Sequence, residues 1–422
     1  MSARPAPSPL LFLFITLLLD IMGIGLIVPI TPGLVAELAP SADPSRHAAL
    51  VGYLFASFTF MQFLAAPFLG ALSDAVGRKP VLLVALVGTS ASYVGMALAN
   101  SLELLFAARV AAGLAGASLS VVSTCIADLS SPEDRAKNFG ILGAAFGIGF
   151  ILGPALGGLL SGHGLRTPFW AAAGLAAVNA VYGTFAVRES LPVALRRAVT
   201  PERLNPLGSW PMLWRLDVGR GLVGVLILSS LAQQCLQTNW VVYTTYRFSW
   251  SPTENGVALA LVGVSAAVVQ GGLIRKIMPV LGEQRAVVWG MLWSAVVFIA
   301  YGLATQGWMM YAILSVAAVG GLSGPALQAL ISMQVDPAEQ GRLQGALASL
   351  VSLTGVVGPL VANGLFSAAT SSSSPFVVPG VAFFMGAILF LGAVAVAASI
   401  FRRHPLLGAV QARKPLVEPV GG

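Results

Sequence analysis

The sequence predicts an all-α membrane protein whose twelve transmembrane helices form two pseudo-symmetric six-helix halves. Of the 422 residues, 57% are hydrophobic and only 9% are charged, and the mean hydropathy is +0.86. Soluble globular domains carry about a quarter charged residues, so the composition excludes that class. Apolar runs long enough to cross a bilayer core, about twenty residues each, recur along the whole chain.

The twelve runs are separated by short polar or charged junctions. The first run continues to residue 30 without a small-residue cleavage site, so it predicts a spanning helix and not a cleaved signal peptide. In chain order, the predicted helices are 9–30, 48–72, 80–99, 102–127, 136–160, 168–187, 218–246, 254–278, 284–303, 307–333, 341–366 and 376–400.

The charged stretch 188–217 is the longest interruption, and it divides the chain into two halves. We expect an N-terminal half at 1–188, a cytoplasmic linker at 189–217 and a C-terminal half at 218–422 that ends in a short cytoplasmic tail. Parallel repeats of this kind predict a binding site at mid-depth between the halves. Three glycine or proline markers recur at one offset of 205 residues: Gly77 with Gly282, Gly140 with Gly345, and Gly153-Pro154 with Gly358-Pro359.

The basic residues predict the orientation. The net charge is +7, and with the N-terminus inside, 19 of the 23 Lys and Arg residues fall in inner loops and tails or in the helix ends next to them. Only Arg46, Arg166 and Arg247 fall in outer loops. This bias follows the positive-inside rule, so both termini are expected in the cytoplasm. No basic run with interleaved aromatic residues indicates nucleic-acid binding.

Two ionisable residues lie inside apolar helices, where charge is costly and usually functional. Asp20 is at the midpoint of the first helix, and Arg109 lies within the fourth. Burial opposes ionisation of a carboxyl group and a nearby cation favours it. Asp20 could therefore load and release a proton, with Arg109 as its partner. The alternatives are a static ion pair or hydrogen-bonded carboxyl for Asp20 and a helix–helix strut for Arg109.

Polar side chains inside other helices predict the wall of a central cavity. Residues 233–239 carry polar side chains more densely than helix packing requires. Elsewhere a single polar residue is as compatible with an interhelical hydrogen bond as with a cavity contact. The predicted cavity residues are Gln62, Ser92, Gln234, Gln237, Asn239, Gln270 and Gln328.

The fifth predicted helix contains GFILGPALGG at 149–158, which places small residues at helical spacing around a proline. Small residues let helices approach closely, and proline kinks a helix. The motif could act as a gate hinge or serve tight packing, and the sequence leaves both open. Its marked residues are Gly149, Gly153, Pro154, Gly157 and Gly158.

No constellation in the sequence predicts an enzyme. His47, His163 and His404 fall in loops or the tail, and no metal-ligand spacing occurs among His, Cys and acidic residues. Cys125 and Cys235 both lie in apolar segments, so no disulfide framework is expected. A Walker A sequence is absent. A transporter driven by an ion gradient is the interpretation that these observations favour.

Three motifs resemble the major facilitator superfamily, specifically its drug:proton antiporters. GALSDAVGRKP at 70–80 is similar to the superfamily's signature loop, RVAAGLAGA at 109–117 to its helix 4 motif, and GFILGPALGG to its helix 5 antiporter motif. Stretches at 19–34, 66–83 and 324–360 resemble the tetracycline/proton antiporters. The resemblance runs over nearly the whole chain and implies the major facilitator fold.

The resemblance also implies roles for single residues. Asp20 matches the family's helix 1 aspartate, and three glutamines match positions along the central cavity, namely Gln62, Gln234 and Gln270. A charged cluster on the inner side matches the conformational switch: Gly70, Asp74, Gly77, Arg78 and Asp128. There Asp74 would sit near the N-terminus of the eleventh helix, and Arg78 would bridge to Asp128. In the second half, Pro279 stands at the position that matches Asp74, so this switch is expected only in the N-terminal half.

Three positions depart from the family. Members that export tetracycline carry an acid where this chain has Ser92, a histidine where it has Ala266, and an aspartate where it has Ser294, which is a further predicted cavity position. The family is thought to export a cationic metal–tetracycline complex. The departures leave Asp20 as the main coupling acid, with a neutral or cationic amphiphilic drug as an alternative cargo.

The expected function is therefore proton-coupled efflux of tetracycline or other amphiphilic drugs by alternating access between the halves. The protein would act as a monomer in the bacterial cytoplasmic (inner) membrane, with a small drug and protons as partners. No cofactor is expected, and a divalent metal would arrive only with the substrate. The alternatives are a proton-coupled importer of a small nutrient on the same fold and a non-transporting membrane sensor.

Overall fold

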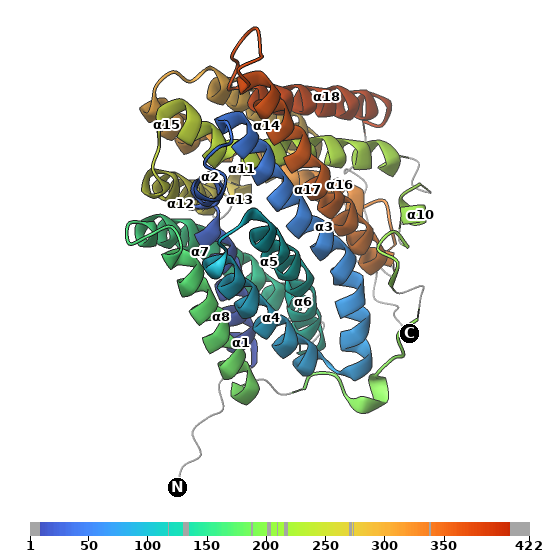
Figure 1. Ribbon diagram of the computed structural model, residues 1–422. Helices are drawn as coiled ribbons and strands as arrows, with labels where there is room; N and C mark the ends of the chain where they lie inside the picture. Colours follow the sequence, from blue (N-terminus) through green and yellow to red (C-terminus); the bar gives the residue numbers. More distant parts are fainter. Residues whose placement is uncertain are drawn as a thin grey trace.

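The computed structural model describes residues 9–116, 118–129, 135–186, 189–200, 204–208, 210–214, 218–269, 272, 274–336 and 339–405. The regular elements in these ranges are helices, which confirms the all-α prediction (Figure 1). Their bounds are α1 (Pro9–Ile27), α2 (Thr31–Leu38), α3 (Pro44–Val76), α4 (Arg78–Leu98), α5 (Leu102–Ala115), α6 (Ser118–Leu129), α7 (Arg135–Ser161), α8 (Thr167–Ala186), η1 (Val193–Leu195), α10 (Trp210–Trp214), α11 (Gly219–Phe248), α12 (Pro252–Val268), α13 (Ile274–Leu281), α14 (Glu283–Leu303), α15 (Gly307–Ala317), η3 (Ala318–Leu322), α16 (Ser323–Ser332), α17 (Gln340–Thr370) and α18 (Val381–Arg403).

Each of the twelve predicted segments overlaps at least one of these helices. Within the described ranges, nine helices are long and apolar enough to cross a membrane, and α12 is a shorter apolar helix. Some predicted segments differ from the observed helices. The first is not interrupted but ends early, at Ile27, and a separate helix, α2, follows it with a proline in its first two positions. The tenth is interrupted by the 3₁₀ segment η3, where Gly320 and Gly321 weaken the α-helix.

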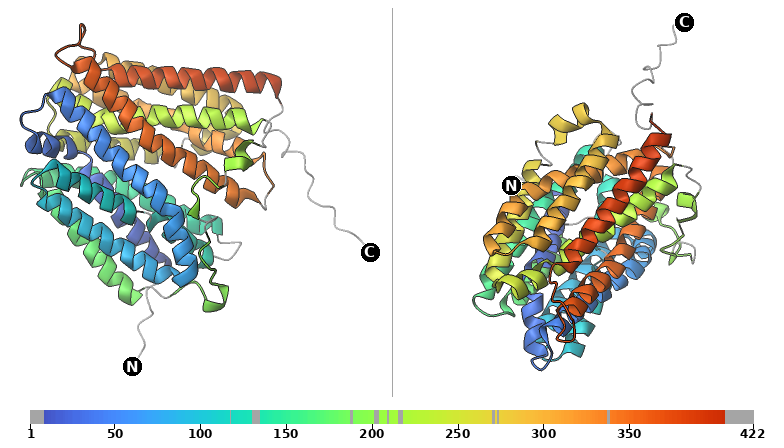
Figure 2. Two further views of the ribbon diagram at one scale, coloured as in Figure 1. Left: turned by 45° about the vertical axis from the view of Figure 1, so that its right-hand side comes forward. Right: turned by 90° about the horizontal axis from the view of Figure 1, so that it is seen from above.

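The two halves contact each other mainly through two helix pairs, α3 with α17 and α7 with α12. Two contacts locate these seams. Thr253 of α12 donates a hydrogen bond to the Gly158 carbonyl of α7 (2.9 Å), and Gly52 of α3 lies against the backbone of α17 at Pro359. Figure 2 shows the halves side by side at this distal face and diverging toward the face where α1 begins and α18 ends, the termini face.

The linker is attached to both halves at the termini face. The Arg197 backbone amide donates a hydrogen bond to the Asp74 carbonyl at the end of α3 (2.9 Å). On the other side, the Trp210 indole donates to the Ser349 hydroxyl of α17 (3.1 Å), and Ser349 donates to the Pro206 carbonyl (2.8 Å). The linker thus crosses between the diverging ends. The predicted domain boundaries themselves stay a prediction.

Candidate functional site

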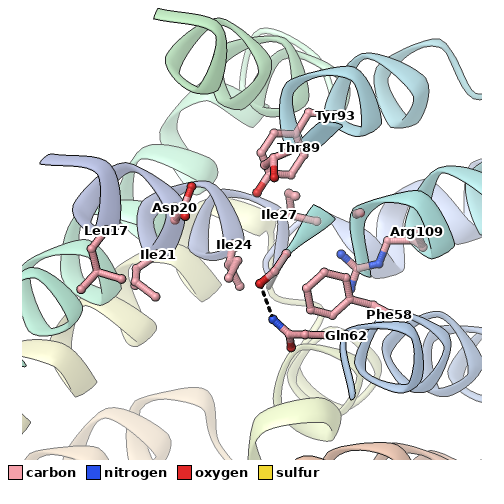
Figure 3. A pocket seen from close by; sticks show the side chains of 12 residues that line it. Leu17, Asp20, Ile21, Ile24, Ile27, Phe58, Gln62, Thr89, Tyr93 and Arg109 are labelled. Carbon is pink, nitrogen blue, oxygen red and sulfur yellow. Dashed lines mark hydrogen bonds between the residues drawn. The ribbon is translucent and has the colours of Figure 1, made fainter. Parts of the chain in front are cut away.

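One face of α1 lines a small chamber in the N-terminal half, which contains a few polar side chains in a mainly apolar wall. Asp20 and Ile24, with Leu17 and Ile27, are spaced three or four residues apart, so they lie on one face of the helix. Together with Ile21 they line a cavity of about 60 Å³ that α3, α4 and α5 complete. Figure 3 shows Asp20 on the side of Thr89 and Tyr93, and Arg109 beyond Ile27. The structure therefore brings the two predicted coupling residues, Asp20 and Arg109, to the same chamber.

Arg109 is a buried cation with few polar contacts. Its exposed fraction is 7%, and its Nε has no hydrogen-bond partner among the described residues. The guanidinium carbon lies 4.7 Å from the ring centroid of Phe58 and 5.3 Å from that of Phe55. Stacking on two aromatic faces supplies part of the attraction that water would otherwise give a cation. The guanidinium is held in a fixed place with donor capacity to spare.

Gln62 lies where the chamber meets a larger space. Its Nε2 donates a hydrogen bond to the Gly116 carbonyl at the end of α5 (2.8 Å; Figure 3). This bond satisfies a carbonyl that the helix terminus leaves without an intrahelical partner. It also ties α3 to the end of the helix that carries Arg109.

The larger space is a cavity of about 610 Å³ between the two halves. Helices α1, α3, α5 and α7 supply its wall from the N-terminal half, and α11, α12, α15 and α17 from the other. Gln62, Phe58 and Arg109 belong to the walls of both this cavity and the chamber. Drug-sized ligands occupy pockets of roughly 300–1,000 Å³ lined mainly by apolar and aromatic side chains. The volume and position of this cavity suit such a ligand.

The glycine motif of α7 faces two helices at once. Gly153 lies against the α1 backbone at Met22 and Gly25, and Gly157 against the α1 backbone at Leu26. Gly158 instead faces the first turn of α12 in the other half. The helix continues through Pro154 from residue 135 to residue 161. The motif therefore provides tight packing against α1 within the N-terminal half and, at Gly158, against the other half. Its role as a gate stays a prediction.

The predicted switch residues gather at the termini face, where α3 passes into α4 through a single residue. The Arg78 guanidinium donates hydrogen bonds to Ser73 (2.7 Å), Asp74 (2.5 Å) and Asp128 (3.1 Å). The predicted contact between Arg78 and Asp128 is confirmed. The predicted length of α3 is wrong, because the helix continues to Val76 and places Asp74 in its last turn. The expected contact of Asp74 with α17 stays a prediction.

Glu189, which follows α8, is a site residue that was not predicted from the sequence. Its carboxylate accepts hydrogen bonds from the backbone amides of Arg78 (2.8 Å) and Lys79 (3.3 Å). These are the first two residues of α4, and an anion at a helix N-terminus interacts favourably with the helix dipole. An acid in the linker and two cations at the start of α4 were both visible in the sequence. Their proximity was not, because 110 residues separate Glu189 from Lys79.

Comparison with known proteins identifies the family to which this architecture belongs. The family model described as Major Facilitator Superfamily matches residues 13–282 and 222–420. The chain belongs to the Major Facilitator Superfamily. It is 39% identical to the class C tetracycline resistance protein of Escherichia coli, over 89% of this chain and 93% of that protein. It is 38% identical to the class G tetracycline resistance protein of Vibrio anguillarum, over 88% and 93%.

A solved relative supports the same assignment. The human organic anion transporter MFSD10 (TETRAN) is 26% identical, with a TM-score of 0.68 over 93% of this chain and 100% of that structure. As a member of the superfamily, the chain is a multi-pass membrane transporter and not an enzyme. The predicted fold class and family are confirmed.

In this superfamily member, some of the residues predicted to line the central cavity do line it, and others do not. Gln62, Gln234 and Gln237 line it. Gln270 lies outside the described residues. Asn239 is fully buried, and neither atom of its amide has a described hydrogen-bond partner.

The remaining three predicted positions face other surroundings. Ser92 donates a hydrogen bond to the Thr89 carbonyl (2.7 Å) and lines a separate groove of about 560 Å³ between α4 and α5. Ser294 donates to the Gly290 carbonyl (2.9 Å), on the side of α14 that packs against η3. Gln328 donates to Gln344 (2.9 Å) near the start of α17. Rotation of each helix about its own axis decides these placements, and residue type does not report that rotation.

The sequence analysis also missed the aromatic part of the cavity wall. Phe55 and Phe58 of α3, Phe146 and Phe150 of α7, and Trp240 of α11 all line it. Aromatic residues are common throughout membrane helices, so their type alone gives no signal. Helical spacing could have paired Phe55 with Phe58 and Phe146 with Phe150 as one-face sets.

Proposed function

We propose that this transporter is a proton-coupled antiporter that exports amphiphilic drugs, tetracyclines among them, from the bacterial cytoplasm. The observation that supports it most is the shared wall between the Asp20 chamber and the central cavity. Gln62, Phe58 and Arg109 belong to both. A change in protonation at Asp20 can therefore reach a bound cargo through side chains that contact both spaces. The tetracycline resistance relatives support the same class of cargo, and export of the drug is a direction of transport that would confer resistance.

The coupling between proton and cargo depends on the free-energy cost of burying the charged form of Asp20. Asp20 is half-buried in a chamber whose wall is mainly apolar, so its charged form depends on nearby polar groups and on access to water. The proton and the cargo bind in turn through states of Asp20. Proton entry from outside then returns the empty transporter for the next cycle.

Alternating access arises from movement of one half against the other. The described arrangement has the halves in contact at the distal face and apart at the termini face (Figure 2). With the termini face in the cytoplasm, as the positive-inside rule favours, this is an inward-open state of a monomer in the cytoplasmic membrane. Closing the termini face would rearrange the cluster of Arg78, Asp74 and Asp128, which gives that cluster its role as a switch.

The test is the exchange Asp20→Asn, measured as gradient-driven uptake of tetracycline into everted membrane vesicles. We expect uptake to fall to the level of vesicles without the protein, because the amide of the variant cannot take up a proton. Asp43→Asn is the matched control, since Asp43 is exposed before α3 and its side chain makes no capping hydrogen bond there. Unchanged uptake by the Asp20 variant would contradict the coupling role. Proton release from the vesicles on adding drug distinguishes antiport from import with protons.

A further inference from the structure

The charge of the central cavity limits what it can carry. None of the described side chains that line it is acidic, and Arg109 is the one ionisable side chain among them. The rest of the wall is apolar, aromatic, hydroxyl or amide, with Gln62, Gln233, Gln234 and Gln237 as its amides. An ionised cargo loses much of its hydration in such a space, and only a compensating group of opposite charge can offset the loss.

A cationic cargo finds no such group among the described residues of this wall. Aromatic faces can hold a cation, but Arg109 already lies over the rings of Phe55 and Phe58. The other aromatic residues of the wall, Phe146, Phe150 and Trp240, carry no negative charge and share the cavity with the Arg109 cation. The acid Asp20 lines the small chamber and is not among the residues that line the cavity. With a volume of about 60 Å³, the chamber has room for a few water molecules and is far smaller than the pockets of roughly 300–1,000 Å³ that hold drug-sized ligands. A cationic metal–drug complex would therefore meet Arg109 and no opposing acid.

An anionic cargo meets an attractive charge in the cavity, but its coupling to protons has the wrong sign for antiport. It would be attracted to Arg109, and most strongly when Asp20 is protonated, because the acid then no longer offsets the positive charge. Proton and anion would bind best together, which favours carrying both in the same direction. Antiport needs the reverse coupling. A cargo without net charge avoids both conflicts and can still accept a hydrogen bond from the guanidinium.

We propose that the cargo is a metal-free aromatic amphiphile without net charge, either uncharged or zwitterionic. An acceptor oxygen of this cargo faces Arg109, and its other polar groups face the amide side chains of the α11 glutamines. This inference rests on the proposed function, because an anionic cargo is excluded only if transport is antiport. It has a consequence for energetics. If a proton enters while an electroneutral cargo leaves, each cycle moves net charge, so the membrane potential drives transport in addition to the pH gradient.

The experiment measures tetracycline uptake into everted vesicles with EDTA, and separately with excess Mg²⁺. We expect uptake to persist in EDTA and to fall as Mg²⁺ converts the drug to its cationic complex. Valinomycin with potassium, which collapses the potential alone, should lower uptake measured in EDTA. Uptake that requires Mg²⁺ and is insensitive to valinomycin would overturn the inference while leaving drug antiport intact. If no amphiphile accumulates under any gradient, the proposed function fails and the inference with it.

A variant pair tests the cause. Gln237→Glu adds an acid to the cavity wall, and we expect it to raise the preference for the Mg²⁺ complex over the free drug by about tenfold, which corresponds to about 1.4 kcal/mol. Gln306→Glu is the matched control, since Gln306 is exposed just before α15 and is not among the residues lining the cavity. Binding of tetracycline with and without Mg²⁺ to the purified proteins gives the ratio independently of transport. An unchanged ratio for Gln237→Glu would contradict the charge argument.

Discussion

The two halves use the same turn in different electrical settings. Gly77 joins α3 to α4 and Gly282 joins α13 to α14, each as a single residue with positive φ (114° and 73°). Each amide donates to a carbonyl four residues earlier, Ser73 and Met278 respectively. The predicted repeat is thus present as matching backbone geometry. The helices that follow, however, begin with opposite charges.

In the second half, α14 begins with Glu283, an anion at the positive end of the helix dipole. In the first half, α4 begins with Arg78 and Lys79, two cations at the same unfavourable place. Acids from elsewhere offset them: Asp74 and Asp128 on the Arg78 side chain, and Glu189 on the backbone. The second turn therefore carries a favourable charge within its own helix, whereas the first depends on partners that a conformational change can remove.

The largest effect should come from Arg78→Gln. It removes the charged donor of the bonds to Asp74 and Asp128, and hydrogen bonds to charged groups are worth about 2–3 kcal/mol at most. We expect the free energy of unfolding in detergent to fall by about that amount. The matched change in the other half is Glu283→Gln, for which we expect a loss of about 0.5 kcal/mol. Equal losses at the two turns would contradict the contrast between them.

A smaller difference should separate Gly77→Ala from Gly282→Ala. Both place a side chain at a φ that only glycine adopts readily, which costs about 1–3 kcal/mol. A Cβ at Gly282 meets nothing within 4 Å, but at Gly77 it would contact the Glu189 carboxylate and Arg196. We therefore expect the larger drop in thermal stability at Gly77. Rescue of the difference by adding Glu189→Ala to both variants would show that the carboxylate is its cause.

The smallest effect should be that of Glu189→Gln. It removes the charge at the start of α4 but keeps a hydrogen-bond acceptor, so the loss in unfolding free energy should be about 0.3–1 kcal/mol. Because Glu189 is exposed, salt should screen the interaction, and the difference from the unmodified protein should shrink in roughly 1 M salt. Circular dichroism melts at low and high salt measure both. A loss that is the same at both salt concentrations would argue against an electrostatic role.

The same contrast extends into the membrane. Helices α4 and α5 correspond to α14 and α15, with starts and N-caps offset by 205 residues. Leu314 takes the place of Arg109, and Phe298 that of Tyr93. Both replacements are buried, and Leu314 lines the central cavity just as Arg109 does. The first half therefore supplies buried polar or charged groups at these positions, and the second supplies apolar side chains.

Much of the site could be predicted because its signals are local. Asp20 and Arg109 stand out as charges within apolar runs, and their cost in lipid makes each informative alone. Ser92 and Gln328 gave a weaker signal, since a polar residue in a helix satisfies itself equally well on a neighbouring carbonyl or in a cavity. Glu189 gave none. Its function depends on a helix that begins far from it in the chain.

The class of the protein, its twelve helical segments, its repeat and the identity of its buried charges could all be predicted from the sequence. These follow from hydropathy, glycine spacing and the energy of charge in lipid, which act along the chain. Packing between segments fixes which helix faces meet. Gln62, Phe58 and Arg109 form a shared wall, Gly158 of α7 lies at the seam, and the Glu189 carboxylate accepts hydrogen bonds from the start of α4. Helical periodicity fixes which residues share a face, but only packing between distant segments fixes what that face contacts.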